Sequence, residues 1–452
     1  MNIVIIGASE IGLYLAKIFS KADYGIVLVD TDSYKLEQAA RELDLATRLG
    51  TGTDWELLED LMELNPDLLI ALTNNDETNL VACSIAKNLG YPRTIGRVRN
   101  PKYFMQSRLN FERLFSVDYL IGPERLTAES IANMILIPGA VAKESFAHGA
   151  VQMRTIKIPA HWKKGQIPLM QRDELELPED VMVGLIRRHK DKEDTLFFPH
   201  GNDTLQAGDE VTFIGKTETV RKLHKFLGMS TKLPKSVVIV GGSLIGINLA
   251  KILQEHGIRI RIIDKSFDKC QLLSELLPYS TVIQRNGTDY PFLQTERIGE
   301  ADVFVTCTRS DEVNFFSGSL ARDLGCDNII ISLSDTNYIP LIEGLGINQA
   351  ASPLLNAANR ILSISREEKI ASMVSMYDNR AEIMEVKVSI DSRIAGIPIR
   401  HLGAELPTDF LIVMIQSRGR IFIADGSRIL SPGDTVVVIS NPKHIDEIKK
   451  LF

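Results

Sequence analysis

The sequence predicts an α/β fold class: two tandem, doubly wound parallel sheets, each followed by a small α+β domain. Two observations lead to this prediction. The chain of 452 residues contains the same landmarks twice, about 234 to 235 residues apart. Within each copy, apolar strand-like runs alternate with amphipathic helical runs. That alternation is typical of a parallel sheet covered by helices on both faces.

The repeat begins with a strand that runs into a glycine loop. Residues 3–12 match residues 237–246, and in both copies a second strand follows that ends in aspartate, at Asp30 and Asp264. Further along, residues 73–79 match residues 308–314. An offset that stays this constant over several landmarks indicates a duplicated unit.

Six strands are expected in the first copy, at residues 2–7, 25–30, 45–49, 67–73, 93–98 and 117–121. Six strands with helical crossovers fit a doubly wound sheet, which binds ligands at the carboxyl ends of its strands where the strand order reverses. After the last strand of each copy, a proline opens a further helix, over residues 124–137 and 354–364. Two roles are open for these helices: docking on a neighbouring subunit, or linking two domains.

The segments that follow each predicted sheet also recur. Residues 205–214 correspond to residues 430–439, and helical runs close the two copies at 220–227 and 444–451. Short strands such as 182–187 and 411–415, separated by Gly and Asp turns, predict strand-rich α+β domains. The predicted domains are residues 1–140, 141–230, 231–366 and 367–452.

Composition argues against several classes of function. The chain has 51 basic and 58 acidic residues and no basic block, so no nucleic-acid partner is expected. No stretch approaches the roughly 18 to 20 apolar residues of a membrane-spanning helix. Met1 is followed directly by a strand-like run rather than a signal peptide, and a cytosolic location is expected.

The four cysteines lack CxxC spacing and the eight histidines lack a cluster, so we expect buried thiols and no metal site.

The glycine loops follow the spacing of the Rossmann fingerprint G-x-G-x-x-G. Residues 7–12 and 241–246 carry glycine at its first and third positions. Those glycines let the chain turn tightly and aim helix amides at a pyrophosphate. Ser9 and Ser243 replace the second glycine. A side chain there crowds the pyrophosphate, although a hydroxyl can also donate a hydrogen bond to it.

Asp30 and Asp264 lie about 18 residues beyond the glycine loops. An acid at this place accepts hydrogen bonds from ribose hydroxyls and repels a 2′-phosphate, which favours NAD or an adenosine nucleotide over NADP. The alternative is that each aspartate caps the following helix.

Two further loops lie at the carboxyl ends of strands. Thr51 follows the third strand, and Thr73 and Asn74 follow the fourth. These residues are placed to line an adenine or ribose pocket. Asp54 and Asp76 in the same loops are alternatively helix caps, and the two roles are compatible.

Arg97 and Arg99 flank the end of the fifth strand, where the second copy has Ser332 and Ser334. Arginine beside a phosphate pocket gives charge-assisted, often bidentate hydrogen bonds. We therefore expect two unequal sites, of which the first is better suited to an anionic ligand. The alternative is that both arginines are solvated surface residues.

Catalytic groups are not apparent in the α+β segments. They offer no His–carboxylate pair, nucleophile elbow, P-loop or metal cluster. A dehydrogenase places an acid–base residue over the nicotinamide. We therefore expect a binding protein rather than an enzyme, with an NAD-dependent oxidoreductase as the second hypothesis.

Taken together, these motifs resemble the TrkA family, the peripheral cytosolic subunits of Trk-type bacterial potassium uptake systems. The resemblance covers the whole chain. It rests on the paired glycine loops, Asp30 and Asp264, residues 73–79 and 97–101, and the two Leu-x-x-Gly-Asp segments that begin at residues 205 and 430. The α/β units are similar to RCK (KTN) N-terminal domains and the α+β units to RCK C-terminal domains.

The resemblance implies that NAD(H), and also ATP or ADP, bind the N-terminal domains and bias the conformation of a homo-oligomeric ring, a tetramer. That ring would lie on the cytosolic face of the inner membrane, beneath a TrkH- or TrkG-type potassium-translocating subunit. The implied first pocket contains Gly7, Ala8, Ser9, Glu10, Ile11, Asp30, Thr51, Thr73, Asn74 and Arg97. The implied second pocket contains Gly241, Gly242, Ser243, Leu244, Ile245, Asp264 and Thr308. A regulator of another cation channel or of a Kef-type antiporter is the remaining alternative.

Overall fold

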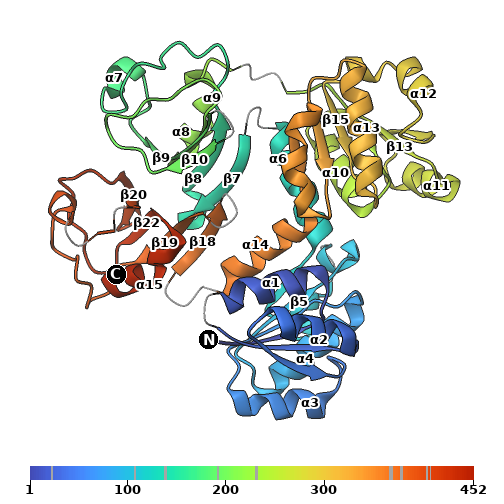
Figure 1. The fold of residues 1–452 in the computed structure, drawn as a ribbon, viewed down its shortest axis with the longest axis horizontal. Coiled ribbons are helices and arrows are strands. Elements are labelled where there is room, and N and C mark those ends of the chain that lie inside the picture. Colours follow the sequence, from blue (N-terminus) through green and yellow to red (C-terminus); the bar gives the residue numbers. More distant parts are fainter. Residues whose placement is uncertain are drawn as a thin grey trace. The chain divides into compact units, whose positions relative to one another are not determined.

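The computed structural model describes residues 1–21, 24–105, 108–136, 140–190, 193–229, 233–365, 370–376, 380–403, 406–407 and 409–452. The chain divides into two compact units, and each unit takes one segment from either half of the sequence (Figure 1). The first unit comprises Met1–Ala132 and Pro234–Ser365, and the second comprises Asn133–Leu233 and Arg366–Phe452.

The first parallel sheet of the first unit has the strand order β3-β2-β1-β4-β5-β6. Its strands are β1 (Asn2–Ile6), β2 (Gly25–Asp30), β3 (Ala46–Leu49), β4 (Leu68–Ala71), β5 (Arg93–Arg97) and β6 (Tyr119–Ile121). The connecting helices are α1 (Glu10–Ser20), α2 (Ser33–Glu42), α3 (Trp55–Asp60), α4 (Asp76–Leu89) and α5 (Phe111–Leu114), with short 3-10 helices at Leu61–Leu64 and Pro101–Phe104. All six expected strands are confirmed, and their ends differ from the expected ones by at most two residues.

The second parallel sheet repeats this topology in the order β14-β13-β12-β15-β16-β17. Its strands are β12 (Ser236–Val240), β13 (Arg259–Asp264), β14 (Thr281–Gln284), β15 (Val303–Thr306), β16 (Ile329–Ser332) and β17 (Gln349–Ala351). The helices are α10 (Leu244–Glu255), α11 (Phe267–Leu276), α12 (Tyr290–Thr295) and α13 (Asp311–Asp323), with 3-10 helices at Ile298–Glu300, Thr336–Leu341 and Glu343–Leu345.

The central strands are apolar on both faces, as a sheet covered by two helical layers requires. In β1, Ile3 and Ile5 belong to one buried cluster, whereas Val4 and Ile6 belong to another on the opposite face. Successive side chains of a strand point to opposite faces, so one short run supplies both cores. The order reverses between β1 and β4, where the two strands pair in parallel.

The helices that follow the last strands are α6 (Pro123–Leu136) and α14 (Pro353–Ser365). Helix α14 packs against α1 of the first copy, and its residues Ala357, Ile361 and Ile364 join the core of the first sheet (Figure 1). The guanidinium of Arg93 donates to the carbonyls of Ile364 and Ser365 at the end of α14, at 3.2 and 3.4 Å. The sequence left open a neighbouring subunit or a linker for these helices; in the structure, α14 docks on the other copy of the same chain.

The second unit contains two antiparallel sheets, with orders β10-β9-β11-β8-β7 and β18-β19-β22-β20-β21. The first has β7 (Ala140–Phe146), β8 (Val151–Lys157), β9 (Val181–Lys190), β10 (Glu193–Phe197) and β11 (Glu210–Lys216). The second has β18 (Ile370–Met376), β19 (Ala381–Lys387), β20 (Phe410–Ser417), β21 (Arg420–Ile423) and β22 (Thr435–Ser440). The helices are α7 (Arg172–Leu175), α8 (Thr217–Val220), α9 (Leu223–Phe226) and α15 (Ile445–Leu451), with 3-10 helices at Ala147–Gly149, Ile399–His401 and Pro442–His444. These are the expected strand-rich α+β domains, although the helical run expected at 220–227 forms two short helices.

The two antiparallel sheets share one buried cluster. It includes Met153, Leu185 and Ile214 from the first sheet and Ile383, Met414 and Ile439 from the second. Gly184 makes this close packing possible, because a Cβ there would lie 2.2 Å from Cδ1 of Ile439. In the part of the chain that the structure describes, no helix is long and apolar enough to cross a membrane.

Replacing Ile361 by alanine tests the docking of α14. Ile361 is fully buried in the cluster that contains the strands of the first copy, so the change should lower the free energy of unfolding by about 2–5 kcal/mol. Urea denaturation of the full chain measures the loss. Asn359→Ala, at an exposed position of the same helix, is the control, and it should change stability by no more than about 0.5 kcal/mol. Equal small effects of both changes would contradict the packing.

Candidate functional site

The glycine loop of each copy touches the end of the fourth strand. Gly7 has φ +105° and Gly241 has φ +112°, a backbone conformation that favours glycine. A Cβ on Gly7 would lie 2.9 Å from the amide nitrogen of Thr73, and one on Gly241 would lie 2.8 Å from that of Thr308. Only glycine suits both the positive φ and the close approach of the threonine backbone. The loop therefore lies against Thr73 or Thr308 at the point where the strand order reverses.

Ser9 and Ser243 occupy the N-cap positions of α1 and α10. Each hydroxyl oxygen accepts a hydrogen bond, from the amides of Gly12 and Gly246 respectively, at 3.3 Å. The Ser243 hydroxyl also donates to the carbonyl of Cys307 at 2.6 Å. Serine at the second fingerprint position thus stabilises the start of the helix.

The first turn of each helix separates buried from exposed side chains. Ile11 and Ile245 are buried in the core, whereas Glu10 is exposed and Leu244 is half-buried. The second copy therefore lacks the acidic group that the first copy has at the start of its helix.

Asp30 and Asp264 bind the glycine loops rather than capping helices. The carboxylate of Asp30 accepts from the amides of Ala8 at 2.5 Å and Asp32 at 2.9 Å. Likewise, the carboxylate of Asp264 accepts from the amides of Gly242 at 2.8 Å and Ser266 at 2.9 Å. The N-caps of α2 and α11 are Asp32 and Ser266, so the capping alternative is wrong for both strand-end aspartates.

The loop after β3 lies beside Asp30, because the amide of Gly50 donates to the carbonyl of Asp30 at 3.0 Å. Thr51 is exposed in this loop, and its hydroxyl lies 3.1 Å from that of Thr53. Asp54 caps α3, as the capping alternative predicted.

Asp76 has a different role from the cap that the sequence suggested. The N-cap of α4 is Asn75. The carboxylate of Asp76 accepts from the backbone amides of Arg99 and Asn100, at 3.0 and 2.9 Å, and so holds the loop that follows β5.

Asn79 and Asn314 hold the candidate site together, a role that the sequence reasoning missed. Asn79 is fully buried, and its side-chain oxygen accepts from the amide of Thr73 at 2.9 Å and from its hydroxyl at 2.7 Å. Its side-chain nitrogen donates to the carbonyls of Thr73 and Arg97, at 3.0 and 2.9 Å. Asn314 makes the same four bonds, to Thr308 and to the carbonyl of Ser332. The signal was present as the shared asparagine that ends residues 73–79 and 308–314.

Arg97 is half-buried, not a solvated surface residue. One guanidinium nitrogen donates to the side-chain oxygen of Asn74 at 3.3 Å. Its Nε is buried and has no hydrogen-bond partner among the described residues. Burial lowers the pKa of Arg97, while the charges of Glu124, Asp76 and Glu10 partly offset this and that of Arg99 adds to it. The group is thus an incompletely paired cation at the carboxyl edge of the sheet.

Arg99 is paired more completely, since its Nε donates to a carboxylate oxygen of Glu124 at 2.8 Å. In the second copy, Ser332 is buried and carries no charge at the position of Arg97. The two carboxyl edges therefore differ in charge as well as in sequence.

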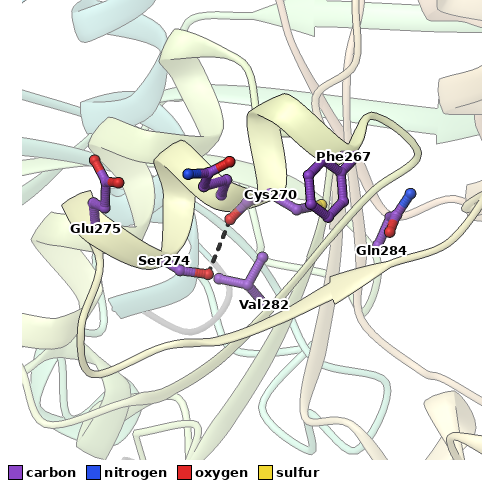
Figure 2. A pocket seen from close by; sticks show the side chains of 7 residues that line it. Phe267, Cys270, Ser274, Glu275, Val282 and Gln284 are labelled. Carbon is purple, nitrogen blue, oxygen red and sulfur yellow. Dashed lines mark hydrogen bonds between the residues drawn. The ribbon is translucent and has the colours of Figure 1, made fainter.

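Two open cavities lie away from the glycine loops. One, of about 460 Å³, lies between α11 and β14 and is lined by Phe267, Cys270, Gln271, Ser274, Glu275, Val282 and Gln284 (Figure 2). The other, of about 630 Å³, lies in the second unit and is lined by Leu196, Phe197, Phe198, His200, Asp203, Arg380, Asp409 and Asn441. None of these residues belongs to the predicted pockets.

The four cysteines are buried and unpaired, as expected. Burial raises the pKa of Cys307 to about 12, which leaves its thiol protonated at neutral pH. No group of three or more His, Cys, Asp or Glu side chains within the described ranges is placed to hold a metal ion.

Comparisons with known proteins cover most of the chain. A family model described as the TrkA-N domain matches residues 3–123 and 237–353, and a TrkA-C domain model matches residues 173–228 and 383–452. The chain is 33% identical over 460 residues to "Trk system potassium uptake protein TrkA homolog 1" of Methanosarcina mazei, with both chains covered completely. It is 30% identical over 465 residues to "Trk system potassium uptake protein TrkA" of Halomonas elongata, covering 100% of this chain and 98% of that one.

Among solved structures, the "GsuK channel bound to NAD" has a similar fold, with a TM-score of 0.65 at 17% sequence identity. The similarity covers 99% of this chain and 78% of the channel chain.

Replacing Asn79 by alanine tests its role in the site. The change removes four hydrogen bonds and leaves the buried amide of Thr73 and the carbonyl of Arg97 without their partner, so it should lower the free energy of unfolding by about 2–3 kcal/mol. Chemical denaturation measures this. Asn88→Ala, at an exposed position of the same helix, should have little effect, and a comparable loss in that control would contradict the assignment.

Proposed function

The chain belongs to the TrkA family, and on this premise we propose that it is a regulatory subunit of a potassium uptake system that binds nucleotides without turning them over. The observation that carries the proposal is the convergence of three features at the reversal point of the first sheet. These are the glycine loop, the carboxylate of Asp30 and the incompletely paired guanidinium of Arg97.

Each feature suits a different part of an adenine nucleotide. The amides of Ser9, Glu10 and Ile11 at the start of α1 would receive the phosphates, because helix N-termini attract anions. Ala8, whose amide donates to Asp30, would border them. Asp30 would accept hydrogen bonds from the ribose, and Thr51 would lie beside the adenosine. Thr73, Asn74 and Arg97 would border the phosphates from the neighbouring strands.

NAD(H) is the proposed ligand, with ATP or ADP as further candidates. The fold shared with the NAD-bound GsuK channel supports this choice. A phosphate beside the half-buried guanidinium of Arg97 would give it an anionic hydrogen-bond acceptor, and charge-assisted bonds of this kind contribute about 1.5–3 kcal/mol.

The second copy offers a related site with Gly241, Gly242, Ser243, Leu244, Ile245, Asp264 and Thr308. Because Ser332 stands where the first copy has Arg97, we propose that the two sites differ in their preference among nucleotides.

The proposed action is exerted on a TrkH- or TrkG-type membrane subunit by a ring of several copies, a tetramer, at the cytosolic face of the inner membrane. A ligand shifts the conformational equilibrium of such a ring only if it binds one conformation more tightly than the other. A difference in binding free energy of about 1.4 kcal/mol per site changes that equilibrium tenfold. The division into domains 1–140, 141–230, 231–366 and 367–452 is part of this proposal; the boundaries at 230/231 and 366/367 fall outside the described residues.

Calorimetric titration with NADH, NAD, ATP and ADP tests nucleotide binding. Arg97→Ser places the residue of the second copy in the first site, and it should weaken the affinity for the ligands that reach Arg97 roughly 10- to 100-fold. Arg41→Ser, at an arginine of α2 whose side chain is 78% exposed, should leave all affinities unchanged. If none of the four ligands binds the unaltered chain, the proposed function is wrong.

Potassium flux into vesicles that contain a Trk-type membrane subunit tests the regulatory role. Addition of this chain should make the flux depend on nucleotide, and Arg97→Ser should blunt that dependence while leaving association with the membrane subunit intact. A chain that binds nucleotides but neither co-purifies with such a subunit nor alters its flux would contradict the proposed partner.

A further inference from the structure

The two copies differ in charge around the acid that ends their second strand. We call this region the ribose end. In the second copy it comprises Asp264, Lys265, Ser266, Asp268, Lys269 and Arg285. The matched residues of the first copy are Asp30, Thr31, Asp32, Tyr34, Lys35 and Gly50. The residues of the second copy include three cations and two acids, whereas those of the first copy include one cation and two acids.

Asp264 is buried and already paired. Its side chain is 8% exposed, and its carboxylate lies 3.5 Å from the ammonium of Lys269. The amides of Gly242 and Ser266 donate to the same carboxylate. Its negative charge is therefore largely neutralised within the protein.

Arg285 lies directly beside Asp264. Its backbone amide donates to the carbonyl of Asp264 at 3.1 Å, the bond that Gly50 makes to Asp30 in the first copy. The Arg285 side chain is exposed, and its guanidinium donates to the carbonyl of Gln284 at 3.4 Å. Lys265, the residue after Asp264, is exposed as well. Two solvent-facing cations thus flank a neutralised acid.

The first copy has the opposite arrangement. Asp30 is less buried than Asp264, and no ion pair joins it to Lys35 among the described residues. Asp32 caps α2 with a second carboxylate, where Ser266 provides a neutral cap in the second copy. Any further anion placed at this end would meet two carboxylates.

We propose that the second copy accepts an adenine dinucleotide that carries a 2′-phosphate on its ribose, such as NADP(H), while the first copy excludes it. A phosphate monoester carries about −1.5 to −2 charges at pH 7. Lys265 and Arg285 can match that charge, while Lys269 compensates Asp264; the first copy has no such pair of cations. This inference rests on the proposed nucleotide-binding function. It also revises, for the second copy, the expectation from sequence that Asp264 disfavours NADP.

The charge of Asp268 opposes such a ligand but does not decide the balance. Asp268 is exposed at the second position of α11, where solvent screens its charge. The two solvent-facing cations Lys265 and Arg285 outweigh it.

The test is a titration of the full chain with NADPH, in which the fluorescence of the dinucleotide reports binding. A parallel titration uses NADH. The unaltered chain should bind one NADPH. The double exchange Lys265→Thr and Arg285→Gly, which installs first-copy residues at exposed positions, should weaken NADPH binding roughly tenfold or more. Lys269→Ala should weaken it similarly. Lys35→Ala, the matched change in the first copy, should leave NADPH binding unchanged.

Each outcome separates this inference from the function on which it rests. If NADH binds but NADPH does not, the inference is wrong and the nucleotide-binding function stands. If NADPH binds and weakens with Lys35→Ala rather than with the second-copy changes, the assignment to the second copy is wrong. If neither dinucleotide, ATP nor ADP binds, both fail.

Discussion

The close approach of the glycine loop to the end of the fourth strand is the constraint on which the candidate site depends. Gly7 and Gly241 leave no room for a Cβ beside Thr73 and Thr308, and the buried amides of Asn79 and Asn314 hold those threonines in place. The same side-chain amides donate to the carbonyls of Arg97 and Ser332, the last residues of the fifth strands. The glycine loop, the loop after the fourth strand and the end of the fifth strand are thereby fixed to one another at the reversal point, a rigid platform for the proposed ligand.

Duplication preserved this platform while the charges around it diverged. The first copy carries an incompletely hydrogen-bonded cation at the end of the fifth strand, at Arg97, whereas the second carries exposed cations at the ribose end, at Lys265 and Arg285. Under the proposed function, moving a cation would change which nucleotide is favoured without altering the backbone, because phosphate positions differ between nucleotides. Two sites with different preferences would let one chain respond to two ligands, provided that each ligand favours one conformation.

The duplicated halves also complete each other's cores. Helix α14 of the second copy supplies Ile361 to the cluster beneath the first sheet, and Arg93 of the first copy binds the carbonyls at the end of that helix. In the second unit, the two antiparallel sheets bury one common cluster, where Gly184 admits Ile439. Neither half therefore keeps its full core without the other.

The sequence by itself determined the duplication, the six-stranded order of elements and the residues at the strand ends. These follow from local patterns, because apolar alternation, glycine spacing and helix-capping residues each act within a few positions. Tertiary structure decided what those residues contact. It showed that Asp76 holds a distant loop instead of capping a helix, that Asn79 bridges two strands, and that α14 docks on the other copy. It also decided that Asp264 is paired with Lys269 while Asp30 is not matched by Lys35. Apart from the local Asp264–Lys269 pair, such contacts join segments far apart in the chain. No local periodicity encodes which of several packed surfaces a helix or a charged side chain will meet.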